Sequence, residues 1–270
     1  MGNILTGDMT EFAYLPSWYS TLSYLENIII KEDWKFRNTI SARINTKNPI
    51  LENYIFYTFR RLVDERNSAD NKEKNNIILI KDDYVCFNTG LFTKNYKLVY
   101  AYFEKNINED SSRKWFLKGF YDDHSTYLLK VYPLPRRARF FTELKDLYFD
   151  ADLEIRVNIN HILEDESNRA RIPASIRNSP NLNILFDGAI ELTRRKAAAN
   201  YNMAVPQYFQ GKMQFLLPVH MLDPRKVDLA LAVSRMDEYY VGHTCISLDM
   251  AYSNARLIAI PETYWLKFDC

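Results

Sequence analysis

The chain has 270 residues, of which 47% are hydrophobic and 26% charged, a composition typical of folded globular proteins rather than disordered ones. Its 35 basic and 34 acidic side chains nearly cancel, so it lacks the positive excess by which nonspecific nucleic-acid binders gain affinity for phosphate. No stretch reaches the roughly 18 apolar residues of a membrane span, and nothing at the start of the chain indicates a secretory signal. Three scattered cysteines predict reduced thiols. We therefore expect a cytoplasmic protein with no membrane partner.

The first half of the chain predicts two helices followed by antiparallel strands. Apolar residues recur at helical spacing over residues 18–29 and again over residues 51–62. Short apolar runs separated by polar segments then predict four strands, at residues 77–80, 84–87, 98–103 and 115–120.

The second half predicts a further mixture of helices and strands. Residues 153–160 alternate between apolar and polar, which is typical of a half-buried strand. Residues 182–200 are rich in strong helix formers. The remaining expected elements are a short helix over residues 140–147, strands at 213–219, 229–233 and 244–248, and a last helix over 249–258.

Helices and strands are mixed without regular βαβ alternation. We therefore predict an α+β fold with a mostly antiparallel sheet and packed helices. The expected organisation is an N-terminal helical or irregular segment over residues 1–50, followed by a single α+β domain over residues 51–270.

The sequence contains none of the common catalytic motifs. A phosphate-binding loop, a nucleophile elbow, a zinc-protease motif and a dinucleotide fingerprint are all absent. The four histidines lie far apart and share no metal-ligand spacing, so we predict no structural metal site. A magnesium ion held by one or two carboxylates stays open, and the cofactor is unknown.

Asn88 and Thr89 form the first of four polar clusters, directly after a predicted strand. A short turn there could direct backbone N–H groups at an anion, and a plain β-turn is the alternative.

The second cluster is the polar face of the strand predicted at residues 153–160. It presents Arg156, Asn158 and Asn160, and His161 follows. Such a row could line a groove, or it could be the solvated side of an antiparallel sheet.

The third cluster lies at the end of the helix predicted at residues 182–200. The planar guanidinium groups of Arg194 and Arg195 suit bidentate binding of phosphate. The polar and aromatic residues that follow could orient a ligand and stack on a base, and they are Asn200, Tyr201, Gln207 and Tyr208. The alternative is a solvated basic helix face.

The fourth cluster pairs Asp249 with Arg256, two turns apart on the last predicted helix. This could be a functional polar stripe, or Asp249 could simply stabilise the first turn of that helix.

Several segments occur here in an order that resembles a family of uncharacterised bacterial domains often joined to OST-HTH (LOTUS) or other small RNA-binding domains. The resemblance covers roughly residues 51–266 and is carried by residues 53–59, 87–91, 188–190, 204–208 and 248–252. It implies an RNA-linked setting. The first 50 residues contain no recognisable OST-HTH segment, so this chain would bind RNA itself or through a partner. Asn202 and Ser253 depart from the Lys and Asn that the family tends to carry.

These observations support two hypotheses. The first is an enzyme that processes RNA or nucleotides at phosphoester or pyrophosphate groups, such as those at RNA ends. His161 or Asp249 would act as general acid or base, and Arg194 and Arg195 would stabilise charge on phosphate. The expected substrate-binding residues are Asn88, Thr89, Asn160, Asn200, Tyr201, Gln207, Tyr208 and Arg256. The second hypothesis is a noncatalytic RNA- or nucleotide-binding module. The oligomeric state is unknown.

Overall fold

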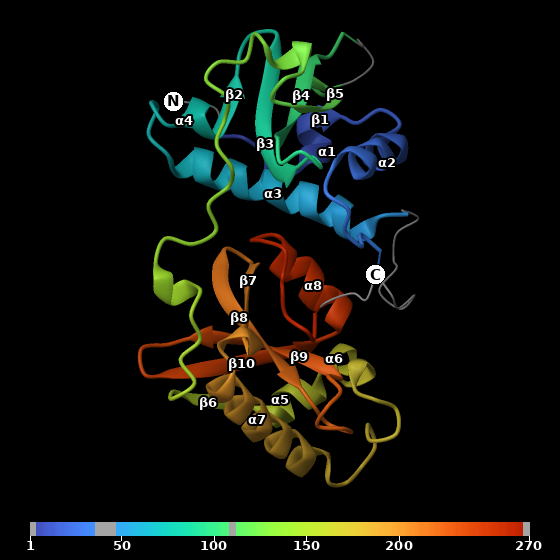
Figure 1. The fold of residues 1–270 in the computed structure, drawn as a ribbon, viewed down its shortest axis with the longest axis vertical. Helices are drawn as coiled ribbons and strands as arrows, with labels where there is room; N and C mark the ends of the chain where they lie inside the picture. Colours follow the sequence, from blue (N-terminus) through green and yellow to red (C-terminus); the bar gives the residue numbers. More distant parts are fainter. Residues whose placement is uncertain (1–3, 36–46, 108–111, 267–270) are drawn as a thin grey trace. The chain divides into compact units, whose positions relative to one another are not determined.

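The computed structural model describes residues 4–35, 47–107 and 112–266. The chain divides into two compact units, residues 1–139 and residues 140–270, each containing a five-stranded sheet (Figure 1). The predicted α+β class with mostly antiparallel sheets and packed helices is confirmed. Residue 50, where the sequence predicts a domain boundary, lies in helix α3 of the first unit. Among the described helices, none is both long and apolar enough to cross a membrane.

The first unit places one long helix against a sheet with strand order β1-β5-β4-β3-β2. Pro49 stands at the start of α3, where its fixed φ and missing N–H suit the first helical turn. The helix and strand bounds are α1 Met9–Phe12, β1 Ala13–Tyr14, α2 Trp18–Ile28, α3 Pro49–Ser68, α4 Lys74–Ile77, β2 Ile78–Ile80, β3 Tyr84–Phe92, β4 Leu98–Lys105, β5 Trp115–Asp122 and the 3-10 turn η2 Thr126–Leu128.

Aromatic side chains form much of the core of the first unit. Phe59 of α3 packs 5.3 Å from Phe87 of β3, and both are fully buried. The opposite face of the sheet carries stacked Tyr84 and Tyr102, covered by the segment that includes η2. Both faces of this sheet are therefore buried.

The second unit has the strand order β6-β10-β9-β8-β7. Strand β6 pairs in parallel with β10, and the β10–β9, β9–β8 and β8–β7 pairs are antiparallel. The bounds are η3 Leu144–Asp146, β6 Glu154–Val157, α5 Ile159–Glu164, α6 Glu166–Arg171, α7 Leu182–Ala199, η4 Tyr201–Met203, β7 Val205–Phe209, β8 Lys212–Val219, β9 Leu229–Arg235, β10 Tyr239–Ile246 and α8 Leu248–Arg256.

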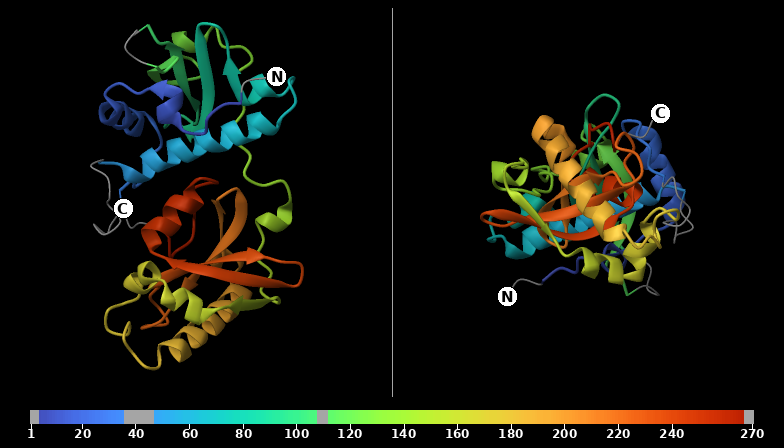
Figure 2. Two further views of the ribbon diagram at one scale, coloured as in Figure 1. Left: turned by 180° about the vertical axis from the view of Figure 1, so that it is seen from behind. Right: turned by 90° about the horizontal axis from the view of Figure 1, so that it is seen from below.

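The two faces of the second sheet are covered by different helices. Phe186 of α7 is fully buried in one core with Phe215 and Leu217 of β8, so the odd-numbered residues of β8 face α7. Successive side chains of a strand point to opposite faces, so Gln214 of β8 faces away from α7. Helix α8 packs on β7 and β9, and the ribbon shows it across the sheet from α7 (Figure 2).

Several segments differ from the sequence predictions, and strand β10, for example, begins at Tyr239 where the predicted strand began at residue 244. The strand predicted at residues 153–160 ends at Val157, because the Asn158 side chain accepts a hydrogen bond from the His161 N–H and caps α5. Strand β7 was not predicted, since it begins Val205-Pro206, but proline is tolerated on the edge strand that β7 forms. In the segment predicted as a helix at residues 140–147, the structure has only the short 3-10 turn η3.

Gly242 allows β6 to approach β10. A Cβ atom at this position would lie 2.8 Å from Val157 Cγ2, and the β-branched valine has little freedom to move. We expect Gly242→Ala to lower the free energy of unfolding by about 1–3 kcal/mol, the usual cost of overpacking. Urea denaturation followed by circular dichroism measures the change.

Gly188→Ala on α7 is the matched control. No atom lies within 4 Å of its would-be Cβ, so this substitution should raise the free energy of unfolding by about 0.5–1 kcal/mol through helix propensity. A Gly242→Ala variant as stable as the parent protein would contradict the close pairing of β6 with β10.

Candidate functional site

A groove runs along the outer edge of the second sheet, between β6 and α7. It consists of two adjoining hollows of about 690 and 640 Å³ that share the lining residues Arg156, Val157 and Asp187. Both volumes fall within the range of small-molecule sites. We call this continuous depression the β6–α7 groove, and its two ends differ in chemistry.

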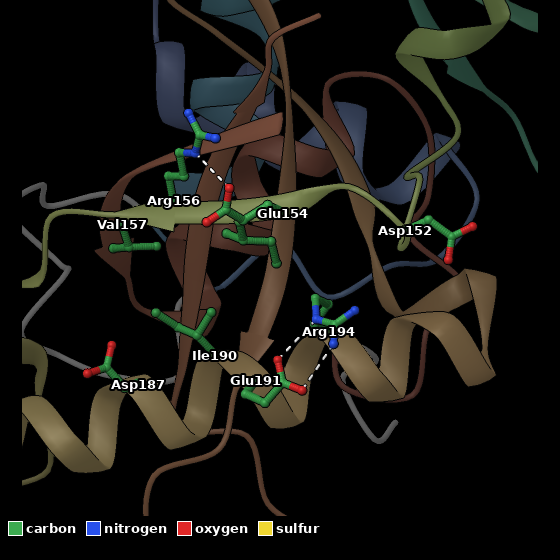
Figure 3. A pocket seen from close by; sticks show the side chains of 9 residues that line it. Asp152, Glu154, Arg156, Val157, Asp187, Ile190, Glu191 and Arg194 are labelled. Carbon is green, nitrogen blue, oxygen red and sulfur yellow. Dashed lines mark hydrogen bonds and ion pairs between the residues drawn. The ribbon is translucent and has the colours of Figure 1, made fainter. Parts of the chain in front are cut away.

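One end, the acidic end, is lined by four carboxylates and two arginines (Figure 3). Arg194 donates from Nε and Nη2 to the two oxygens of Glu191, at 3.0 and 3.1 Å. Arg195 donates to the same carboxylate at 2.8 Å. The hydrogen bonds from Arg194 and then Arg195 lower the pKa of Glu191 to about 2. At neutral pH the side chains of Arg194 and Arg195 are therefore already paired with the ionised Glu191 carboxylate.

The other end, the amide end, is lined by Asn158, Asn160 and Asn183, with Asp187 as its carboxylate. The Asn183 amide nitrogen donates to the Asn160 oxygen at 2.9 Å, which ties α7 to α5. This pair still offers the Asn160 nitrogen as a donor and the Asn183 oxygen as an acceptor. The amide end can therefore recognise a ligand that presents both donors and acceptors.

A cation–π pair lies where the two ends meet. The guanidinium carbon of Arg156 lies 4.0 Å from the centre of the Tyr239 ring, and its Nε donates to Glu154 at 2.8 Å. Arg156 points away from α7 in the close view (Figure 3). The pair thus links the groove to the sheet face opposite α7 and presents a broad, flat, cationic surface.

A hydrogen-bonded row of polar side chains crosses the face of the second sheet opposite α7. Asn254 of α8 donates to Gln207, Gln207 donates to Gln214, and Gln214 donates to Ser234, at 2.9, 2.9 and 3.1 Å. His243 Nε2 lies 2.8 Å from the Ser234 hydroxyl. Burial, and then the charge of Lys212, lower the pKa of His243, which favours the neutral ring. We call this the polar row.

The sequence-predicted residues of the second unit divide between these two sites. Arg194 and Asn160 line the groove, and Arg195 and His161 are exposed beside it without lining it. Gln207 belongs to the polar row, on the opposite face of the sheet. Asp249 and Arg256 are buried on α8. The predicted arginines, amides and acid–base groups do not share one cleft.

Asn200, Tyr201 and Tyr208 lie at the end of α7 and in the following strand. Asn200 caps the 3-10 turn η4 by accepting from the Asn202 N–H, and the Tyr201 side chain is 75% exposed. The Tyr208 ring packs 5.1 Å from the Phe140 ring. Tyr208 therefore contributes to packing within the second unit.

Asn88 and Thr89 are buried inside β3 of the first unit, where the sequence left open an anion-binding turn or a plain β-turn. The Thr89 hydroxyl donates to the Val99 carbonyl at 2.7 Å, and the Asn88 amide donates to the Pro135 carbonyl at 3.1 Å. A bulge next to Gly90, whose φ is +77°, keeps the strand continuous. These side chains hold local structure within the first unit.

Sequence reasoning missed Glu191, Asn183 and Tyr239. Glu191 lies three and four residues before Arg194 and Arg195 on a predicted helix, and this spacing could have revealed the ion pairs. No local sequence pattern indicated Tyr239, because its approach to Arg156 depends on the pairing of two strands that are distant in the sequence.

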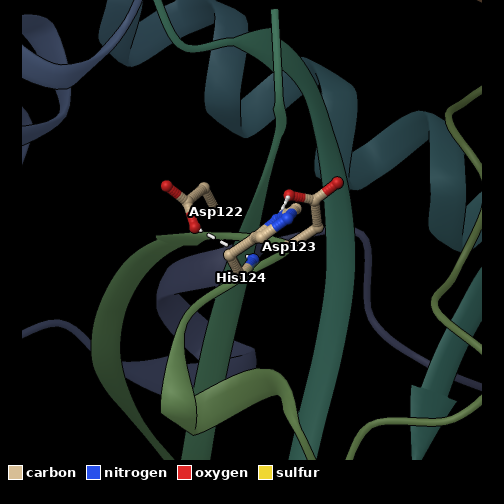
Figure 4. Close-up of side chains that lie close together, drawn as sticks. All are labelled: Asp122, Asp123 and His124. Carbon is tan, nitrogen blue, oxygen red and sulfur yellow. Dashed lines mark hydrogen bonds and ion pairs between the residues drawn. The ribbon is translucent and has the colours of Figure 1, made fainter. Parts of the chain in front are cut away.

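The described residues contain one cluster with the composition of a metal site, Asp122, Asp123 and His124 (Figure 4). His124 Nδ1 lies 2.7 Å from Asp123, and its backbone N–H donates to Asp122. These bonds shape an exposed turn after β5, and we assign no ion to it. Cys86 and Cys245 are buried free thiols, and Cys270 lies outside the described residues.

The low pKa of Glu191 gives a direct test of the acidic end. A carboxyl whose pKa is depressed keeps its ion pairs as pH falls through the ordinary value of 4.5 and loses them only near pH 2. Carbon-13 NMR of the Glu191 carboxyl should therefore show a midpoint near 2. In the Arg194→Ala/Arg195→Ala variant the midpoint should return toward 4.5, and an unchanged midpoint would refute the proposed cause.

The comparisons with known proteins give one result. No curated protein and no solved structure matches the chain. The pattern of a domain of unknown function, DUF3825, matches residues 25–265, which includes the whole second sheet, every strand of the first sheet except β1, and the whole groove. Because the match covers most of the chain, this protein belongs to the DUF3825 family.

Proposed function

We propose that this protein is an RNA- or nucleotide-binding module, and that the amide end of the β6–α7 groove holds a base of the ligand. The observation that carries the proposal is the Arg156–Tyr239 pair, which lies beside three asparagine amides in an open hollow. A planar base can stack on a guanidinium or an aromatic ring, and amide groups can hydrogen-bond to its edge.

The charges of the groove favour binding through the base rather than through a phosphate clamp. The acidic end combines four carboxylates with two arginines, and Glu191 already engages Arg194 and Arg195. A phosphate there would meet repulsion from the carboxylates and would have to displace Glu191. The phosphates of a bound nucleotide are therefore expected to lie outside the acidic end.

The RNA-linked setting that the sequence resemblance implies is consistent with this proposal. The expected association of such domains with OST-HTH or other RNA-binding domains would place this protein near RNA, and this link stays a prediction. The balanced overall charge argues against broad RNA affinity and favours a compact site.

Substitution of Tyr239 tests the binding site. Stacking on an aromatic side chain contributes about 1–3 kcal/mol per base, so Tyr239→Ala should weaken binding of a ribonucleoside monophosphate roughly 5- to 150-fold. Tyr148→Ala is the matched control, because Tyr148 is an exposed tyrosine of the same unit that does not line the groove. Isothermal titration calorimetry with the four monophosphates measures the effect. Equal losses in both variants would reject the site.

Processing of RNA at phosphoester or pyrophosphate groups is the second candidate, favoured by the position of Arg194 at the groove and by the compact site that the net charge implies. Its acid–base assignment is weakened, because Asp249 is buried on α8 and His161 does not line the groove. If the candidate is right, the protein turns over 5′-capped, adenylylated or phosphorylated RNA. The Arg194→Ala/Arg195→Ala variant should then lose at least about tenfold in kcat. Tight binding of these RNAs without turnover would contradict the enzyme and support the noncatalytic binding module.

A further inference from the structure

The sheet face opposite α7 is covered in part by α8, and it carries exposed side chains beyond the groove. Strand alternation and register place Lys212 and Gln214 of β8, Ser234 of β9, and Tyr239 of β10 on this face. Arg156 of β6 joins them, since it pairs with Val241 and lies over the Tyr239 ring. The surface therefore continues the cation–π pair of the groove across the remaining strands.

An exposed aromatic ring lies at the far edge of the same face. Phe209 pairs with Lys212 at the β7–β8 turn, and its side chain is 44% exposed. Three inter-strand steps separate β7 from β10, so Phe209 and Tyr239 lie about 14 Å apart across the strands. Lys212 and Met236, which is 41% exposed, lie between the two rings, and each ring offers a stacking surface for a base.

The polar row lies alongside the line that joins the two rings, two residues further along the strands, and it has one hydrogen-bond direction. Each amide donates to the next residue, from Gln207 through Gln214 to Ser234. Because Ser234 accepts from Gln214, its own proton is available for His243 Nε2. The row is thus fixed before any ligand binds, and Gln207, which is almost fully buried, anchors it. The half-buried members of the row, Gln214 and Ser234, keep further donor or acceptor capacity for base edges and ribose hydroxyls.

We infer that this face binds a single-stranded RNA segment of two or three nucleotides that runs across the strands from Tyr239 to Phe209. The inference rests on the proposed function and names its ligand class. Sheets that present aromatic rings in this way stack two or three bases.

The charges of the face favour RNA over a protein partner. Among the described residues that alternate onto this face of the five strands, Glu154 is the one carboxylate, and it is paired with Arg156. Lys212 lies on β8, next to the edge strand β7, and Arg156 lies on the other edge strand, β6, where it is paired with Glu154. Their positive charges lie toward the two sides of the sheet, where a phosphate backbone crossing the strands would enter and leave.

Fluorescence anisotropy with 5′-labelled oligoadenylates of one, three and six nucleotides tests the inference. The trinucleotide should bind at least about tenfold more tightly than the mononucleotide, and the hexanucleotide little better than the trinucleotide. Phe209→Ala should return the trinucleotide to the affinity of the mononucleotide and leave mononucleotide binding unchanged. Lys212→Glu, at another exposed position, should also weaken trinucleotide binding by charge reversal, and Tyr148→Ala should have no effect.

The possible results separate the two proposals. If the mononucleotide and the trinucleotide bind equally and Phe209→Ala changes neither, the extended site is wrong while the groove proposal stands. If no oligonucleotide or monophosphate binds the folded protein, the proposed function itself fails. A trinucleotide of deoxyadenylate that binds as tightly as the RNA trinucleotide would overturn the assignment to RNA. A Phe209→Ala variant that changes sedimentation but not RNA binding would identify a protein interface instead.

Discussion

Strand β6 pairs in parallel with β10, from Glu154 opposite Tyr239 to Val157 opposite Gly242, and no other described strand pairs with its outer edge. This pairing brings the Arg156 guanidinium over the Tyr239 ring and leaves a groove between β6 and α7. The absence of a side chain at residue 242 is what allows the two strands to approach, since a Cβ there would meet Val157. The groove therefore depends on a contact between segments more than 80 residues apart.

Charge pairing decides which groups of the site can act on a ligand. Glu191 accepts hydrogen bonds from Arg194 and Arg195, and its carboxylate remains ionised far below neutral pH. These pairs are largely exposed, so each contributes little to stability, but together they occupy the guanidinium groups that would otherwise receive a phosphate. Arg156 is also paired, with Glu154, yet it keeps its flat surface against an aromatic ring. The site is suited to stacking and amide recognition more than to neutralising phosphate.

The two faces of the second sheet carry different chemistry because of the period of two in strands. Odd-numbered residues of β8, such as Phe215 and Leu217, are buried against α7, whereas Lys212 and Gln214 face the other way. The polar row on that face is satisfied within itself, from Gln207 through Gln214 to Ser234. A fully connected row of this kind costs little to keep half-buried, and it fixes the orientation of each amide.

The sequence by itself determined the α+β class and most of the helices and strands, because apolar periodicity and proline positions act locally, as at α3 and α7. It also identified Arg156, Asn158 and Asn160 as polar strand positions that could line a groove, and Arg194 as a candidate phosphate ligand, and all four line the groove. Only the tertiary structure decided that Gln207 lies on the opposite face, that Asp249 and Arg256 are buried on α8, and that Asn88 and Thr89 are internal. The reason is that strand register and sheet order depend on contacts between distant residues, and a short-range pattern does not specify which face of which sheet a polar residue joins.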